Sequence, residues 1–136
     1  MPKDKCKIIY TAIFTTWLDE FGICRTVVKT NAVITLKDAQ ENTSAVNRIS
    51  DNGCPPLLVD LREIKSINKD ARDHFAMRDR KPGITAIAML LKSPLSKVIG
   101  NFFLGINMPS VPTKLFTSEE RAIEWLRKNF IKTRPA

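Results

Sequence analysis

The fold is decided by the stretch Leu57-Leu58-Val59-Asp60-Leu61, an apolar run interrupted by a single aspartate. Apolar runs of this length are typical of strands that are covered by helices. Asn68, a good N-cap residue, follows the run and predicts the start of a short helix that contains Ala71 and Phe75. The stretch therefore begins a strand, a loop and a helix.

The same alternation continues toward the C-terminus. Pro82-Gly83 marks a turn, and residues 84–91 predict the most deeply buried strand, because Thr85 is their only polar residue. Ser93-Pro94 then predicts a helix, with serine as N-cap and proline at the first helical position. Pro109 ends this helix, whose apolar stripe consists of Leu95, Val98, Ile99, Phe102, Phe103 and Ile106.

The C-terminal part predicts one more strand and one more helix. The strand covers residues 111–116, and the segment Thr117-Ser118-Glu119-Glu120 has the pattern of a capping box that begins with Thr117. The apolar residues of the last helix recur at helical spacing, which predicts that they face the core: Ala122, Ile123, Trp125, Leu126 and Phe130.

The N-terminal part predicts a hairpin and a long helix. Residues 8–18 and 23–29 are rich in strand-forming types, and turn-forming residues separate them. Thr35 and Asp38 have the spacing of a capping box, and apolar residues recur at helical spacing over residues 36–50.

These elements predict an α/β fold with the order ββαβαβαβα. Alternating strands and helices after a hairpin indicate a mixed, mostly parallel sheet packed with about four helices. A chain of 136 residues is too short for separate hydrophobic cores, so we expect a single domain over residues 1–136 with an ordered core at about 8–131.

Composition limits the partners and the compartment. The formal net charge of +8 favours acidic or anionic partners without identifying one. Cys6, Cys24 and Cys54 form no C-x-x-C motif, which favours a reducing cytoplasm over a disulfide framework. The longest uncharged stretch, residues 98–113, is too short for a membrane span and is interrupted by Asn101, Gly105, Pro109 and Pro112.

No residue pattern carries a catalytic signature. His74 is the only histidine, and we interpret it as a partly exposed helical residue rather than a base. The five glycines form no phosphate-binding motif. We therefore expect a protein that is not an enzyme and that has no cofactor and no metal.

The helix that begins at Ser93 carries a candidate surface for a partner. Leu104 and Met108 lie opposite its apolar stripe, near Lys97, and with Lys114 they form a candidate patch for a protein partner or a homodimer. Two facing lysine clusters would repel, so a homodimer and an acidic partner remain equal alternatives. A nucleic-acid surface is not favoured, because the phenylalanines fall on the core stripe.

Three stretches resemble one protein family. They are residues 57–67, 98–105 and 112–117, and together with the order of elements they resemble small uncharacterised bacterial proteins with the STAS-like (SpoIIAA-like) fold of anti-sigma-factor antagonists. In those antagonists a serine or threonine at the start of the helix after the aspartate-ended strand is phosphorylated. The matching place here is about Lys69-Asp70-Ala71, which has no hydroxyl.

The resemblance implies a non-enzymatic regulatory or protein-interaction domain. We expect its contact surface in the loop and helix from Arg62 to Phe75. The charge of Asp70 either mimics a phosphorylated state or favours the positive end of the helix, and Ser66 is the nearest hydroxyl. The alternative is a small anionic or lipid-like ligand bound near the helix N-terminus. The candidate residues for both hypotheses are Arg62, Lys65, Ser66, Lys69, Asp70 and Arg72.

Overall fold

The centre of the fold is a six-stranded mixed sheet. The computed structural model describes residues 7–50, 53–77, 84–93 and 112–131. The sheet has the order β1-β2-β3-β5-β7-β8. β2 is antiparallel to both of its neighbours, β1 and β3, and β3, β5, β7 and β8 are parallel. The strands are β1 Ile8–Tyr10, β2 Phe14–Leu18, β3 Cys24–Val28, β5 Leu57–Asp60, β7 Ile87–Leu90 and β8 Thr113–Phe116. The predicted α/β fold with a mostly parallel sheet after a hairpin is confirmed.

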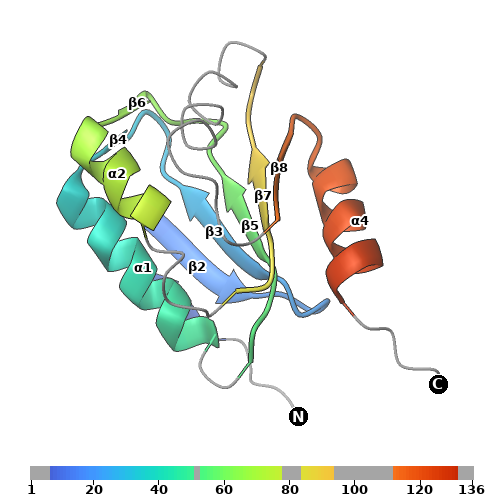
Figure 1. Cartoon of the computed structure of the whole chain (residues 1–136). Helices are drawn as coiled ribbons and strands as arrows, with labels where there is room; N and C mark the ends of the chain where they lie inside the picture. The colour runs from blue at the N-terminus through green and yellow to red at the C-terminus, as the bar shows by residue number, and fades with distance from the viewer. Residues whose placement is uncertain (1–6, 51–52, 78–83, 94–111, 132–136) are drawn as a thin grey trace.

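Helices cover the two faces of this sheet unequally. The described ranges contain α1 (Leu36–Ser50), α2 (Lys69–Met77) and α4 (Glu119–Phe130). α1 packs on β2, β3 and α2, whereas α4 packs on β7 and β8 (Figure 1). The fourth predicted helix, which begins at Ser93, falls almost wholly on residues 94–111, outside the described ranges.

The alternation of side chains along the strands divides the core into two layers. Met89 of β7 and Phe14 of β2 lie in the layer beneath α1 and α2. Ala88 and Leu90 of β7 point to the other face, where they pack with Leu126 of α4. Val59 and Ile87, which the apolar runs place in the interior, are half-buried and pack against the α1 layer.

The predicted helix over residues 36–50 is confirmed at both ends. Thr35 caps it, since the backbone N–H of Asp38 donates to Thr35 Oγ1 at 3.2 Å and the backbone N–H of Thr35 donates to Asp38 Oδ2 at 3.0 Å. This reciprocal pair satisfies donors that a helix start leaves unpaired. The side of the helix that faces the sheet is buried, and it includes Ala39, Ala45 and Val46.

A polar cluster is buried between α1 and the hairpin. The hydroxyls of Thr16 and Thr26 lie 2.8 Å apart on the facing strands β2 and β3, and Asn42 Nδ2 donates to Thr26 Oγ1 at 2.7 Å. All three side chains are buried, so these hydrogen bonds replace lost contacts with water.

The structure corrects four details of the predicted elements. Residues 8–18 form two strands, because Thr11 and Phe14 make a turn in which Thr11 N–H donates to the Phe14 carbonyl at 2.8 Å. The strand predicted over 84–91 is shorter, Ile87–Leu90. The N-cap of α4 is Ser118 and not Thr117, since Ser118 accepts from the Arg121 N–H at 3.3 Å.

The fourth correction is a small second sheet that the sequence did not predict. β4 (Val33–Ile34) pairs in parallel with β6 (Ser66–Ile67). Each strand has two residues, too few for any hydropathy pattern to be visible. The pair anchors the loop that leads into α2.

Candidate functional site at the start of α2

The loop between β5 and α2 is held in place along its length. The backbone N–H of Asn31 donates to the Glu63 carbonyl at 2.7 Å, and that of Lys65 donates to the Ala32 carbonyl at 2.8 Å. The N–H of Asn68 donates to Ile34 at 2.9 Å just before α2 begins. Backbone hydrogen bonds from a neighbouring segment thus fix the loop, which therefore presents its side chains in a defined geometry.

Arg62 binds the aspartate that ends β5. Arg62 Nε donates to Asp60 Oδ1 at 3.0 Å and Nη2 donates to Asp60 Oδ2 at 2.8 Å, a bidentate contact. The hydrogen bond to Asp60 is the main cause that raises the pKa of the Arg62 guanidinium above its ordinary value. Arg62 Nη2 also lies 3.2 Å from Glu119 Oε1.

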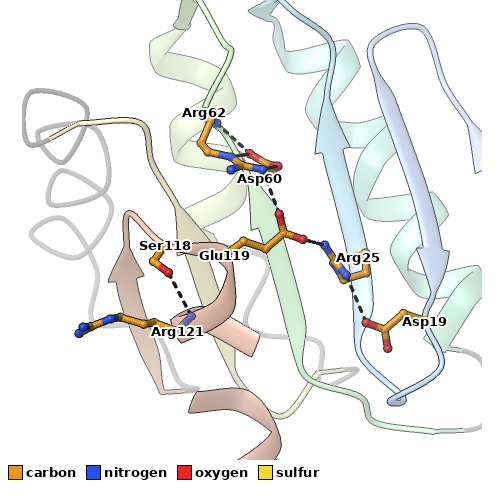
Figure 2. Close-up of polar contacts among 7 residues, drawn as sticks. All are labelled: Asp19, Arg25, Asp60, Arg62, Ser118, Glu119 and Arg121. Atoms are coloured by element: carbon orange, nitrogen blue, oxygen red, sulfur yellow. Dashed lines mark hydrogen bonds and ion pairs between the residues drawn. The ribbon is translucent and has the colours of Figure 1, made fainter. Parts of the chain in front are cut away.

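Glu119 extends this contact into a chain of charges on the α4 side of the sheet (Figure 2). Its other oxygen, Oε2, accepts from Arg25 Nη2 at 2.6 Å, and Arg25 Nη1 lies 3.4 Å from Asp19 Oδ2. We call these five residues the charge chain: Asp19, Arg25, Glu119, Arg62 and Asp60. Arg62 thus serves to join β5 to the start of α4.

Sequence reasoning missed Asp19, Arg25 and Glu119, the members of the charge chain that lie outside the loop after β5. Arg25 and Glu119 are 94 positions apart in the chain, and no local spacing relates them. The only signal available was an acid in the first turn of a helix, which is common.

The four other candidates next to the start of α2 share one exposed rim. Lys65 lies in the loop, Ser66 in β6, and Lys69 and Asp70 in the first turn of α2. We call these four residues the α2 rim. Lys69 Nζ pairs with Asp73 Oδ2 at 3.0 Å, one helical turn later.

Arg72, the sixth candidate, is turned back onto the loop. Its Nη1 donates to the backbone carbonyl of Ile67 at 2.7 Å, and the side chain is partly buried. The structure therefore places Lys65, Ser66, Lys69 and Asp70 at the surface, whereas Arg72 is bound to the loop backbone and Arg62 binds Asp60 and Glu119.

The predicted patch on the fourth helix can be placed only in part. Lys97, Leu104 and Met108 lie outside the described residues. Lys114 is an exposed residue of β8, and its Nζ lies 5.6 Å from the ring centroid of Phe116 and 5.9 Å from that of Trp125.

The remaining reactive side chains are one histidine in α2 and the cysteines. His74 is half-buried in α2, where its Nε2 lies 2.9 Å from Thr43 Oγ1 of α1. Cys24 is buried in β3, and Cys54 is exposed. Over the described ranges, no three residues of the His, Cys, Asp and Glu types gather closely enough to hold a metal ion.

A hollow of about 420 Å³ lies between the turn that joins β1 to β2 and the carboxyl end of β3. It is lined by residues 10–15 and 27–30, and none of the six candidate residues contributes to it. The loop at the start of α2 is thus an exposed polar surface and not part of this hollow. No helix in the described part of the chain has the length and hydropathy that a membrane span requires.

Comparisons with known proteins identify relatives without a known activity. The sequence profile of the Domain of unknown function (DUF7793) matches residues 16–129. A crystal structure from Shewanella loihica PV-4, an uncharacterised DUF3478 protein with a SpoIIAA-like fold, is similar with a TM-score of 0.55 and 14% identity. The match covers 93% of this chain and 98% of that one, and it confirms the predicted SpoIIAA-like fold.

A second solved structure is similar in sequence. It is a protein of unknown function from Arthrobacter sp. FB24, 36% identical over 84% of this chain and 92% of that one, with a TM-score of 0.34. Comparison with curated protein sequences gives no match.

Proposed function

Because the chain belongs to the DUF7793 family and has a SpoIIAA-like fold, we propose that it is a non-enzymatic domain of the cytoplasm that regulates or binds another protein. The proposed contact surface is the α2 rim with the neighbouring part of α2, up to Phe75. One observation carries the proposal: a polar rim is exposed on a loop whose backbone is fixed by hydrogen bonds to the neighbouring segment 31–34.

The chemistry of the rim favours a protein partner. Exposed side chains of both signs alternate with a hydroxyl over a few residues, since Lys65 and Lys69 are cations and Asp70 is an acid. A protein surface can match such a mixed pattern with its own charges, and fixed backbone lowers the entropy that binding costs. Asp70 is exposed in the first turn of α2. Its position supports the proposal that its permanent negative charge takes the place of the phosphorylated residue in the antagonists.

The second candidate function is binding of a small anion or an anionic lipid headgroup. Lys65 supports it, because this exposed lysine makes no ion pair with any described residue. Arg62 and Lys69 support it less, since each already binds a carboxylate. We therefore rank a protein partner first.

The test compares two charge reversals of the same kind. Tagged wild-type protein, Lys65→Glu and Lys37→Glu are used to capture partners from native lysate at low and at moderate salt. Lys37 is an exposed lysine of α1 outside the rim and serves as the matched control. We expect one partner that wild type and Lys37→Glu retain at moderate salt and Lys65→Glu loses.

Two other results would contradict the proposal. Loss of every captured protein at moderate salt would show charge attraction alone. Chemical-shift changes at Lys65, Ser66 and Lys69 on titration with inorganic phosphate, without any retained protein, would favour the small-anion function instead.

A further inference from the structure

The outer edge of β1 is open in the described part of the structure. β1 is the first strand in the order of the six-stranded sheet, so one side pairs with β2 and the other side pairs with no described strand. Its residues, Ile8, Ile9 and Tyr10, include no charge and no proline. Edge strands of monomeric proteins usually carry charges, prolines or bulges that prevent pairing with another strand.

The hydrogen-bond phase of the hairpin shows which groups face this edge. Thr11 N–H donates to the carbonyl of Phe14, the residue directly opposite it, which identifies a hydrogen-bonded pair. Because such pairs alternate along an antiparallel ladder, Ile9 and Thr16 form the next one. The backbone N–H and C=O groups of Ile8 and Tyr10 therefore point away from β2, toward the free edge.

The side chains of the same two residues are exposed. The exposed fraction is 44% for Ile8 and 73% for Tyr10, and both lie on the sheet face that bears Trp17 and Thr15. α4 covers the other end of this face, over β7 and β8. An apolar strip thus runs beside the row of outward backbone groups.

We propose that β1 pairs with β1 of a second copy of this chain in antiparallel orientation, with Ile9 at the two-fold axis. In this register Ile8 lies opposite the partner's Tyr10, and Tyr10 lies opposite the partner's Ile8. Both pairs are then hydrogen-bonded pairs, and the four N–H and four C=O groups that face the two edges all find partners. The sheet becomes continuous across the two copies.

The charges near β1 permit this register. Lys7 lies opposite the partner's Thr11, so no lysine faces another lysine. Each copy carries a net charge of +8, and the two copies repel one another at long range. Added salt screens that repulsion, so the dimer strengthens between low and moderate salt. An acidic partner on the same edge would show the opposite salt dependence.

The first test measures association by sedimentation at several concentrations and salts. Tyr10→Pro removes an outward N–H without removing a donor to β2, and Ile8→Lys places a charge beside the partner's Tyr10. Val33→Lys is the matched control, because Val33 is exposed to 41% and lies in β4. We expect dimers of wild type and Val33→Lys, and at least a tenfold weaker association of both β1 variants.

The second test locates the two-fold axis by cross-linking. Residues directly opposite in a non-hydrogen-bonded antiparallel pair have Cα atoms about 4.5 Å apart, within the range of a disulfide. With Cys6 and Cys54 replaced by serine, Ile9→Cys should form a covalent dimer on oxidation, whereas Ile8→Cys and Val33→Cys should not. Circular dichroism of each variant confirms that the fold is retained.

The proposal is overturned by any of three outcomes. These are a wild-type protein that stays monomeric up to high concentration at moderate salt, a dimer that survives both β1 variants, and cross-linking of Val33→Cys as efficient as that of Ile9→Cys. None of these outcomes bears on the α2 rim, which lies on a different part of the chain.

Discussion

Arg25 of β3 and Glu119 of α4 meet with Nη2 and Oε2 2.6 Å apart, although 94 positions separate them in the chain. The contact joins the antiparallel part of the sheet to the helix that covers its parallel part. Glu119 is also the first residue of α4, where a negative charge favours the helix dipole. One carboxylate therefore fixes the position of the helix and supports its start.

The first prediction concerns this contact. Glu119→Gln should lower the free energy of unfolding by about 1 kcal/mol, because two charge-assisted contacts weaken at a partly exposed site. Glu120→Gln is the control, since Glu120 is exposed and binds no described cation. Urea unfolding of both variants measures the difference. Equal midpoints for the two would show that the charge chain adds no stability.

A second prediction concerns the buried amide of Asn42. Asn42→Ala should lower the free energy of unfolding by about 2 kcal/mol, since it leaves the buried hydroxyls of Thr16 and Thr26 with one donor fewer. Asn47→Ala in the exposed part of the same helix should change it by no more than about 0.5 kcal/mol. Thermal unfolding checks both values, and a stable Asn42→Ala would contradict the assigned hydrogen bonds.

A third prediction separates two neighbouring hydroxyls. Ser118→Ala should destabilise the protein by about 1 kcal/mol because it removes the acceptor for the Arg121 N–H, the N-cap contact of α4. Thr117→Ala should have almost no effect. Urea unfolding of both variants checks this order. A lower midpoint for Thr117→Ala than for Ser118→Ala would show that Thr117 is the N-cap.

The interior of β7 provides a fourth prediction. Leu90→Ala should cost about 2–5 kcal/mol, because Leu90 is fully buried between the sheet and α4. Ile87→Ala should cost clearly less, because Ile87 is only half-buried. Chemical denaturation measures the loss of unfolding free energy in each variant. Equal losses would show that Ile87 is more deeply buried than in the structure.

A fifth prediction follows from the raised pKa of Arg62. A base whose folded-state pKa is raised stabilises the fold fully below its unfolded pKa, and the stabilisation is lost only as pH rises toward the raised value. The difference in unfolding free energy between wild type and Arg62→Gln should therefore stay constant from about pH 6 to about pH 9. A difference that falls within this range would show that another group controls the contact.

The sequence predicted those helices and strands whose caps and apolar patterns lie within a short stretch of the chain. The helix over residues 36–50 was predicted because its cap and its apolar stripe both lie within the helix and the residue before it. The N-cap of α4 was misplaced by one residue because Thr117 and Ser118 are both good caps, and only the geometry selects between them.

Contacts between distant segments could not be predicted from one sequence. Pairing of β4 with β6 depends on the path of the chain around α1, and two-residue strands have no period of their own. Arg62 was predicted as a candidate for a protein contact or an anion site, yet it also binds Glu119, which is 57 positions away in the chain. Exposure of Lys65, Ser66, Lys69 and Asp70 agrees with their predicted place at the surface.

The buried cluster of Thr16, Thr26 and Asn42 also selects one alignment of the hairpin against its competitors. A slip of β2 by a single residue would turn Thr16 to the opposite face and bring Thr15 or Trp17 under α1. Asn42 would then be buried without its acceptor, a penalty that an entirely apolar contact would not impose. The hydrogen bonds among these two hydroxyls and the amide therefore disfavour misaligned pairing of β2 during folding.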